Sequence, residues 1–278
     1  MEEHSWLWVQ QPSQSIQALR ALLGLNRLPS LKAKNLLVLI GFLVTSLSSL
    51  AQVFDVTHVD GEPTRTFLLA THNPKALVLL YPGGGGMLRL QEDGSTRNGH
   101  TFVRSKDLWS QYDVDAVLVD TPYDLGDLRR GDMRGREEHL QRVNEVIDFY
   151  RSKLNLPIWI FGHSMGTSTV SNFLNGDPIN QKKIEGAIIA GTIRSASIDD
   201  DVKIPLEAIH HVQDSCLGSL PENSKRIISD RPKNLPSKLI LIDGGISEGN
   251  ECEAFAYHGF NKTEPEFVDA AAQFILSH

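Results

Sequence analysis

The sequence predicts an α/β protein whose mostly parallel, twisted sheet is covered by helices on both faces. Short apolar runs typical of buried strands alternate with segments of helical periodicity, which is the pattern of a parallel sheet. A second observation is the run GHSMG at residues 162–166, which lies between the apolar Ile158–Phe161 and the small-residue helical pattern Thr167–Leu174. The third is length, because residues 52–278 suit one large domain with a sizeable core.

The expected strands are short and almost wholly apolar. In chain order they are Thr64–Ala70, Ala76–Tyr81, Ala116–Val119, Ile158–Phe161, Ala187–Ala190, Leu206–Ile209 and Leu239–Ile242. Periodic apolar residues predict helices over Glu137–Leu154, Thr167–Leu174 and Phe267–Leu276. Only about fifteen residues separate Ala190 from Leu206, so we expect no large lid there.

Residues 1–51 are predicted to be a signal peptide with an N-terminal extension. Lys32 and Lys34 precede an uncharged apolar run, Leu36–Val44, and small residues then lead to Ala51. The run of about nine residues is too short to span about 30 Å of hydrocarbon. We therefore expect cleavage after Ala51 and an exported protein, periplasmic or extracellular, with no stable membrane anchor. An uncleaved anchor is the alternative.

Charge excludes some classes of partner. The full chain has a formal net charge of −7, and residues 52–278 keep 23 of the 27 basic and 32 of the 34 acidic residues, which gives −9. Such a protein has no general attraction for nucleic acid or for an anionic membrane.

The long segment that precedes the apolar run Leu36–Val44 raises a second hypothesis, that translation begins at Leu31.

The chain has two cysteines, Cys216 and Cys252, and both follow the predicted signal peptide. Two cysteines in an exported domain predict one disulfide bond. Two free buried thiols are the alternative. No paired C-x-x-C spacing occurs, so we expect no metal site and no cofactor.

The GHSMG run predicts a nucleophile elbow. A serine squeezed into a sharp turn between a strand and a helix presents its Oγ above the sheet edge, and the N–H of Met165 then points at a substrate carbonyl oxygen. His163 is expected to pack inside the elbow. The competing interpretation is a tight strand–helix turn in which Ser164 is inert.

Residues 52–278 resemble the α/β-hydrolase family, in particular its esterase and dienelactone-hydrolase-like members. The resemblance rests on GHSMG, on Asp214 after the strand Leu206–Ile209, and on the run YHGF at residues 257–260. In that family a serine, an acid and a histidine follow the fifth, seventh and last strands. The resemblance thus implies Ser164 as nucleophile, Asp214 as acid and His258 as base.

Some of these assignments have rivals. Asp243, at the end of the last strand, is the main competitor for the acid, and Asp120 is a weaker one. His210 and His211 are interpreted as strand-end residues, although together with Asp214 they also resemble a metal-ligand set.

A glycine run, Gly83–Gly86, follows the strand Ala76–Tyr81 and Pro82. The family places the second oxyanion-hole N–H in this loop, so Gly84 and Gly85 are the candidate donors beside Met165. Pro82 stands where lipases often carry histidine, which leaves the choice between the two glycines open. The alternatives are a plain flexible loop and a phosphate-binding loop, but no G-K-[ST] follows.

The segment 87–113 is the longest stretch with no predicted element near the mouth of the site. Its polar side chains are interpreted as solvated, with substrate contact as the alternative; they are Arg89, Arg97, Asn98 and Arg104.

Together these observations predict an exported, single-domain, carboxylesterase-like serine hydrolase that acts on a small-molecule or acyl-ester substrate. A peptidase or an acyltransferase would use the same three residues, since the acyl-enzyme is common to all of them. A binding protein on an inactive hydrolase scaffold belongs to another class, because fold does not imply activity. No oligomeric state is predicted.

The export hypothesis makes a direct prediction. Protein recovered from the exported fraction of the native host should begin at or near Gln52, because the small residues before it suit a signal peptidase. Intact mass and N-terminal sequencing would measure this, and a mass equal to all 278 residues in that fraction would refute it.

Overall fold

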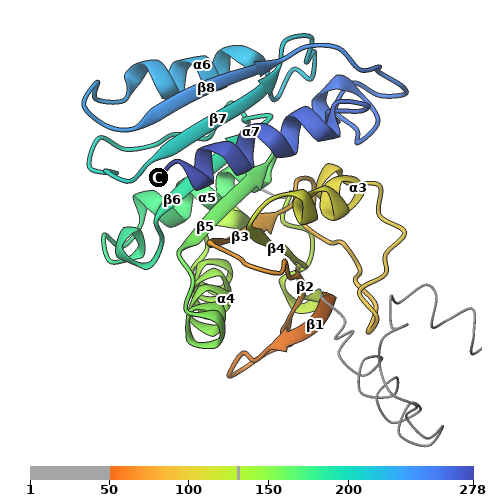
Figure 1. The fold of residues 1–278 in the computed structure, drawn as a ribbon, viewed down its shortest axis with the longest axis vertical. Helices are drawn as coiled ribbons and strands as arrows, with labels where there is room; N and C mark the ends of the chain where they lie inside the picture. Colours follow the sequence, from red (N-terminus) through yellow and green to blue (C-terminus); the bar gives the residue numbers. More distant parts are fainter. Residues whose placement is uncertain (1–50, 130–131) are drawn as a thin grey trace, which may run out of the picture. The chain divides into compact units, whose positions relative to one another are not determined.

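The fold is that of a computed structural model, and it is described for residues 51–129 and 132–278 (Figure 1). The predicted signal peptide and extension, residues 1–51, lie outside the described residues except for Ala51. Ala51 is the first residue of strand β1, so the predicted cleavage would remove one residue from that strand. Within the described part of the chain, no helix combines the length and the apolar character needed to cross a membrane.

One sheet of eight strands runs through the described residues, in the order β1-β2-β4-β3-β5-β6-β7-β8. Neighbouring strands from β4 to β8 are parallel, whereas β2 is antiparallel to both β1 and β4. The bounds are β1 Ala51–Val56, β2 Thr64–Leu69, β3 Ala76–Tyr81, β4 Val114–Val119, β5 Ile158–His163, β6 Gly186–Ala190, β7 Leu206–His211 and β8 Ser237–Ile242.

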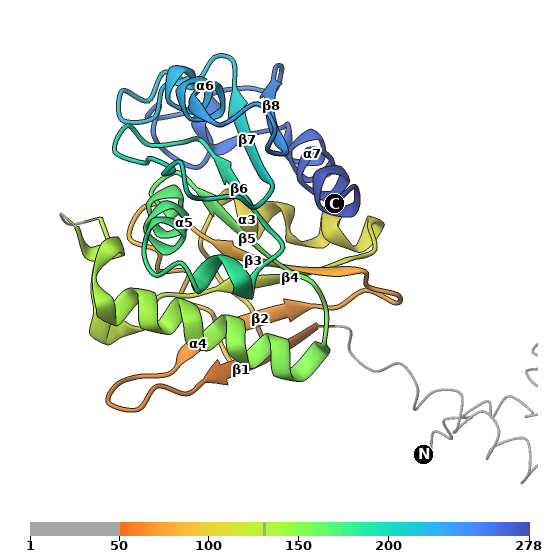
Figure 2. The same ribbon diagram turned by 90° about the vertical axis from the view of Figure 1, so that its left-hand side faces the viewer.

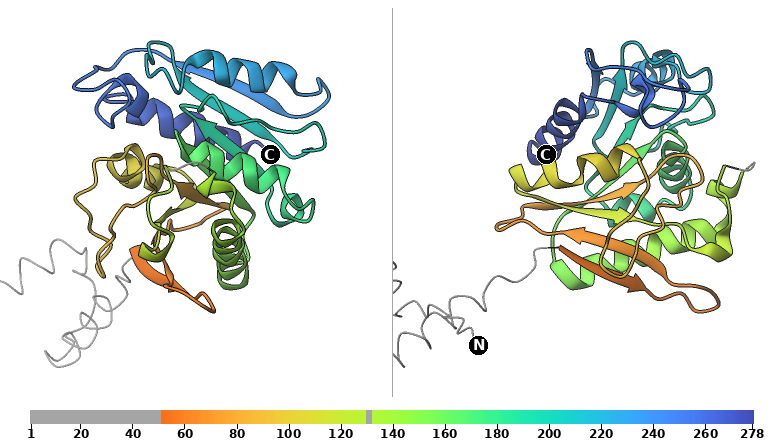
Figure 3. Two further views of the ribbon diagram at one scale, coloured as in Figure 1. Left: turned by 180° about the vertical axis from the view of Figure 1, so that it is seen from behind. Right: turned by 90° about the vertical axis from the view of Figure 1, so that its right-hand side faces the viewer.

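Helices cover both faces of this sheet, and Figures 2 and 3 show the two layers from opposite sides. On one face lie α4 (Glu137–Leu154), α5 (Gly166–Asn175) and α6 (Pro221–Asp230), whose buried side chains belong to one apolar cluster. On the other face, α3 (Thr101–Ser105) and α7 (Glu264–Leu276) contribute to a second cluster. The predicted fold class is confirmed.

Burial explains why these runs form strands. Every residue of β3 to β7 is buried, because parallel strands are covered by helices on both faces. The two edge strands β1 and β8 are only partly buried. Helix α4 carries Glu137 and Glu138 in its first turn and Arg151 and Lys153 in its last, charges that complement the helix dipole.

Most predicted strands are found within one or two residues of their expected bounds, and α4 has the bounds predicted for it. Among the strands and α-helices of the described residues, β1, α3 and α6 were not predicted. Segment 87–113 is not irregular throughout, because it contains α3 and a 3-10 helix at Lys106–Gln111. Strand β7 also extends beyond Ile209 to His211, so both histidines lie within it.

Two glycines allow β5 and α5 to meet in a tight turn. A Cβ at Gly162 would lie 2.3 Å from the carbonyl oxygen of Gly166, and a Cβ at Gly166 would lie 2.1 Å from the carbonyl oxygen of Tyr81. Such contacts are far below van der Waals distance, and a backbone atom cannot rotate away. The turn therefore requires glycine at both positions.

Replacing Gly166 by alanine should destabilise the protein by about 3 kcal/mol, at the upper end of overpacking effects, because the obstacle is backbone. Thermal or denaturant unfolding would measure the loss. Gly218→Ala is the matched control, since a Cβ there meets no atom within 4 Å. Equal stability of the two variants would contradict the packing argument.

Candidate active site

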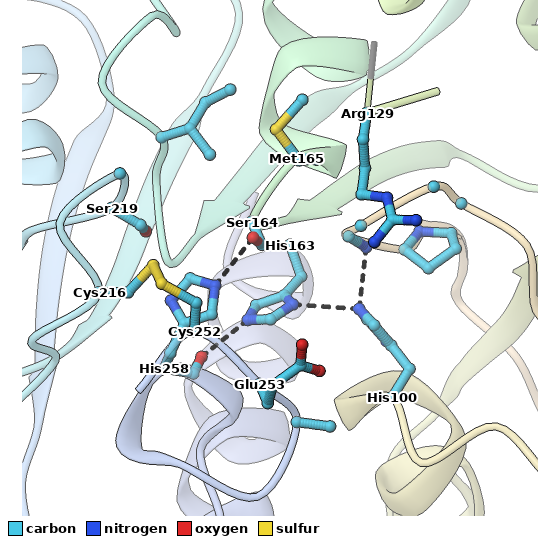
Figure 4. Close-up of a pocket in the computed structure, with 18 of the residues that line it drawn as sticks. His100, Arg129, His163, Ser164, Met165, Cys216, Ser219, Cys252, Glu253 and His258 are labelled. Atoms are coloured by element: carbon cyan, nitrogen blue, oxygen red, sulfur yellow. Dashed lines mark hydrogen bonds between the residues drawn. A yellow bond between two sulfur atoms is a disulfide. The ribbon is translucent and has the colours of Figure 1, made fainter. Parts of the chain in front are cut away.

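The carboxyl ends of β5, β7 and β8 lead into loops that surround one pocket of about 1130 Å³. Ser164 and His258 line this pocket together with the glycine loop, Gly83–Gly86 (Figure 4). Ligands of open α/β sheets bind at this edge, because the loops after parallel strands converge there.

Ser164 occupies the elbow with a positive φ of 53°, a conformation that non-glycine residues adopt rarely. Its N–H donates to the carbonyl oxygen of Ala190 at 2.8 Å, and its own carbonyl accepts from the N–H of Thr167 at 2.9 Å. These bonds fix the turn between β5 and α5. The serine hydroxyl is consequently held toward the pocket, as Figure 4 shows.

The structure brings Ser164, His258 and Asp214 into one hydrogen-bonded line. His258 Nε2 lies 2.8 Å from Ser164 Oγ, and His258 Nδ1 lies 2.8 Å from Asp214 Oδ2. His258 is supplied by a 3-10 turn, Tyr257–Gly259, between β8 and α7. Because a carboxylate only accepts, Nδ1 carries the proton and Nε2 is free to accept from the serine hydroxyl.

Asp214 is held as a carboxylate. Its burial would raise the pKa, but hydrogen bonds from His210 and His258 outweigh this and hold the pKa below the usual value. The N–H of Cys216 donates to the other oxygen, Oδ1, at 2.9 Å. An ionised carboxylate is what an imidazole needs to accept a proton at its far nitrogen.

The rival acids lie elsewhere. Asp243 is exposed, and its Oδ1 accepts from the N–H of Gly244. Asp120 is buried, and its oxygens accept from the N–H groups of Leu88, Leu90 and Thr121. Neither aspartate hydrogen-bonds His258 in the described residues, whereas Asp214 does.

His163 packs beneath the elbow, as expected. Its Nε2–H donates to the carbonyl oxygen of His258 at 2.9 Å, and its Nδ1 lies 3.1 Å from Nε2 of His100. Burial drives the pKa of His163 well below its usual value, and desolvation lowers that of His100 to about 3. Both rings are therefore neutral, and His163 links the elbow to the loop that carries His258.

The glycine loop lies directly against Ser164. A Cβ at Gly83 would be 2.8 Å from Cβ of Ser164, whereas one at Gly85 would be 2.7 Å from Oδ1 of Asp127. The N–H of Gly83 donates to Nε2 of His100, and the N–H of Gly86 donates to the carbonyl of Gly83.

The remaining candidate donors are unengaged. Among the described residues, the N–H groups of Gly84, Gly85 and Met165 form no hydrogen bond. They are thus available to a ligand oxygen in the pocket.

Arg134 supports this loop from behind. The side chain is buried, and its Nη2 donates to the carbonyl oxygens of Pro82 and Gly84, each at 3.0 Å. Burial lowers the pKa of Arg134 to about 9, which still leaves it charged at neutral pH. No motif marks this residue, so sequence analysis did not find it.

His100 and His210 were also not assigned a role at the site. His100 caps α3 and lies in a stretch without periodicity, and His210 was interpreted as a strand-end residue or, alternatively, as part of a metal-ligand set. The only signal for His210 is its spacing of four residues before Asp214. Within residues 51–129 and 132–278, no group of three or more His, Cys, Asp or Glu side chains is arranged to hold a metal ion.

The polar residues of segment 87–113 have separate roles. Asn98 lines the pocket, whereas Arg104 binds Glu264 and the carbonyl of Gly259. Arg89 lies over the ring of Tyr123, 3.6 Å from its centroid, and Arg97 is exposed.

A disulfide bond joins Cys216 to Cys252, as predicted, with the two Cα atoms 4.8 Å apart. Cys216 lies two residues after Asp214, and Cys252 lies six residues before His258. Both cysteines line the pocket. The bond thus ties the loop that carries Asp214 to the loop that carries His258.

Removing the bridge should weaken both stability and turnover. The Cys216→Ser, Cys252→Ser double variant should lose about 2–5 kcal/mol of unfolding free energy. Any catalytic turnover at this site should also fall at temperatures below the melting transition, because the Asp214 and His258 loops lose their tether. Thermal unfolding and initial rates would measure the two effects. Wild-type values for both would show that the bridge is dispensable.

Three solved structures have folds similar to that of this chain. A dienelactone hydrolase from Anabaena variabilis is 15% identical over 82% of this chain and 99% of its own, with a TM-score of 0.58. A Xanthomonas campestris protein, described as an α/β serine hydrolase without a lid, is 12% identical over 83% and 96%, with a TM-score of 0.56. A Saccharomyces cerevisiae monoglyceride lipase, with a substrate analogue, is 14% identical over 80% and 95%, with a TM-score of 0.51.

No family model and no curated protein matches the sequence. Identities this low establish shared architecture rather than shared activity. The strand order, the elbow after β5 and the likeness to these structures together show that the chain has the α/β-hydrolase fold without a large lid.

Proposed function

We propose that the chain is a serine hydrolase that cleaves an ester or related acyl bond through an acyl-enzyme on Ser164. The observation that carries the proposal is the hydrogen-bonded line from Ser164 Oγ through His258 to Asp214, with 2.8 Å at each step. A serine hydroxyl is a weak nucleophile at neutral pH, and an adjacent base oriented by a carboxylate is the arrangement that activates it.

In the acylation step, Ser164 Oγ attacks the acyl carbon while its proton passes to Nε2 of His258. The carbonyl oxygen gains the negative charge of the tetrahedral intermediate. Collapse of that intermediate breaks the bond to the leaving alcohol, which takes the proton from His258 Nε2. Asp214 stabilises the imidazolium throughout and does not itself become protonated.

In the deacylation step, water attacks the acyl carbon and gives a proton to His258 Nε2. The second intermediate releases the carboxylic acid, and the proton returns to Ser164 Oγ. The chain's own residues therefore complete the cycle, and the proposal includes no cofactor.

The oxyanion would be held by the N–H of Met165 and the N–H of Gly84. Met165 immediately follows the nucleophile, and its N–H is the standard first donor of this fold. Gly84 is preferred to Gly85 because Gly83 lies against Ser164, whereas Gly85 lies against Asp127. Arg134 binds the carbonyls on either side and keeps the loop in place before substrate arrives.

A small-molecule ester is the proposed substrate class. The pocket is large, and the short connection between β6 and β7 leaves it without a covering domain. The neighbouring monoglyceride lipase structure contains a substrate analogue, and its name describes an enzyme that acts on an ester. Export would fit the disulfide bond, because such bonds persist in oxidising compartments.

Replacing Ser164 by alanine should reduce ester turnover by about 10⁴-fold or more while leaving the melting temperature within a few degrees. The alanine removes the only atom that forms the acyl bond. Initial rates on p-nitrophenyl esters, together with thermal unfolding, would test this. Unchanged hydrolysis would overturn the assignment.

The acid assignment predicts an ordering of two matched variants. Asp214→Asn should lower kcat by about 10³- to 10⁴-fold, since the amide no longer orients His258 or stabilises its charge. Asp243→Asn makes the same change on an exposed residue outside the line and should leave kcat unchanged. The reverse ordering would assign the acid to Asp243.

A substrate panel tests the function as a whole. The protein should hydrolyse p-nitrophenyl esters of short and medium acyl chains much faster than peptide amides. Amide cleavage at comparable rates would indicate a peptidase, and transfer of the acyl group to an added alcohol in preference to water would indicate an acyltransferase. No turnover of either bond would favour an inactive binding scaffold.

A further inference from the structure

Two imidazoles contact the carboxylate of Asp214 in the described residues, and the second, besides His258, is that of His210. It lies in β7 with its side chain fully buried, and its Nε2 is 3.1 Å from Asp214 Oδ2. The same Nε2 is 2.9 Å from the carbonyl oxygen of Ser219. On the other side of the ring, Nδ1 is 2.8 Å from Oγ of Ser224, a residue of α6.

The partners of the ring determine where its proton is. A carboxylate oxygen and a carbonyl oxygen can only accept, so Nε2 carries the hydrogen and shares it between Asp214 and Ser219. In this tautomer Nδ1 carries no hydrogen and can accept from the hydroxyl of Ser224. That hydroxyl in turn lies 2.7 Å from Oγ1 of Thr192, which can donate to it.

Asp214 Oδ2 consequently receives two imidazole N–H groups, one from His258 and one from His210. The first belongs to the loop after β8 and the second to β7, so the carboxylate is fixed between two parts of the fold. With the N–H of Cys216 on Oδ1, rotation of the carboxylate would break bonds on both oxygens.

We propose that His210 is a positioning residue for the reaction, which holds Asp214 Oδ2 in the orientation that His258 requires. The Ser224 and Thr192 hydroxyls hold His210 in the tautomer that donates to Asp214. This role rests on the proposed function, because it acts through the acid of the Ser164, His258 and Asp214 line. Through Ser224, helix α6 then contributes to the orientation of Asp214, although no α6 residue lines the pocket.

Two variants that place a side-chain amide at different distances from the backbone provide the test. In His210→Gln the amide nitrogen takes the place of Nε2, and its two hydrogens suit both Asp214 and Ser219. In His210→Asn the amide ends near the position of Nδ1, so it can bond Ser224 but does not reach Asp214. Each variant buries one neutral amide. His210→Gln keeps the bond to Asp214 and loses the one to Ser224, and His210→Asn does the reverse, so a lower kcat in the Asn variant reports on the bond to Asp214.

The expected result is a split between the variants in kcat. His210→Asn should lower kcat on p-nitrophenyl esters by about 10- to 100-fold, the effect of losing one hydrogen bond to a charged group, with KM changed less than about two-fold. His210→Gln should stay within about three-fold of the wild type. Ser224→Ala removes the hydroxyl that bonds His210 Nδ1 but leaves the contact between His210 and Asp214 possible. It should lower kcat by a smaller factor in the same direction.

A second readout does not depend on activity. The Nδ1 proton of His258, held between nitrogen and carboxylate, should give a low-field proton resonance in histidine-labelled protein. We expect that resonance in the wild type and in His210→Gln, and its loss or upfield shift in His210→Asn. Its absence from the wild type would contradict the Asp214–His258 bond itself.

These outcomes separate the inference from the proposed function. A wild type that hydrolyses no ester but shows the resonance change in His210→Asn would refute the function and keep the positioning role. An active wild type whose kcat and resonance are the same in His210→Asn would overturn the inference, as would equal losses in the Asn and Gln variants. If His210→Asn does not fold, wild-type kcat and resonance in Ser224→Ala would overturn the proposed role of the hydroxyls.

Discussion

Hydrogen bonds to the buried carboxylate of Asp214 connect the separate loops that form the site. Its side chain is 1% exposed, and an isolated charge at such a depth would be strongly unfavourable. Three N–H donors surround it, from His258, His210 and Cys216. Because each donor belongs to a different position in the chain, satisfying this one charge fixes the end of β7, the disulfide-bonded loop and the turn before α7 relative to one another.

A second constraint is the strained turn at Ser164. The positive φ of the serine is retained in a turn where α5 begins so close to β5 and to Tyr81 of β3 that glycine is required at residues 162 and 166. His163 then links the turn to the carbonyl of His258, while Arg134 and His100 hold the glycine loop that lies against Ser164. Ser164, His258 and the glycine loop are thus supported by buried polar contacts, which favours a preorganised site.

Much of this arrangement could be predicted from the sequence. Fully buried strands such as β3 and β5 give continuous apolar runs, and α4 has a clear helical period, so their positions were confirmed. The order of Ser164, Asp214 and His258 along the chain, and the pairing of the two cysteines, followed from the elbow and from the family resemblance. Their convergence in space agrees with that order.

What the sequence did not predict has physical reasons. Strand β1 is a half-exposed edge strand, α3 has only five residues, and α6 is polar, so none produces a strong periodic signal. Arg134 and His210 act through contacts between segments far apart in the chain. Arg134 reaches the carbonyls of Pro82 and Gly84, and His210 reaches Ser224 of α6. Such roles depend on three-dimensional packing and leave no local pattern.

The central claim is that Ser164 is the activated nucleophile of this pocket. Reaction of the native protein with a fluorophosphonate, followed by peptide mass spectrometry, measures this directly, because only an activated serine forms the stable adduct. We expect one adduct per chain, located on Ser164. No adduct, or an adduct on another residue, would contradict it.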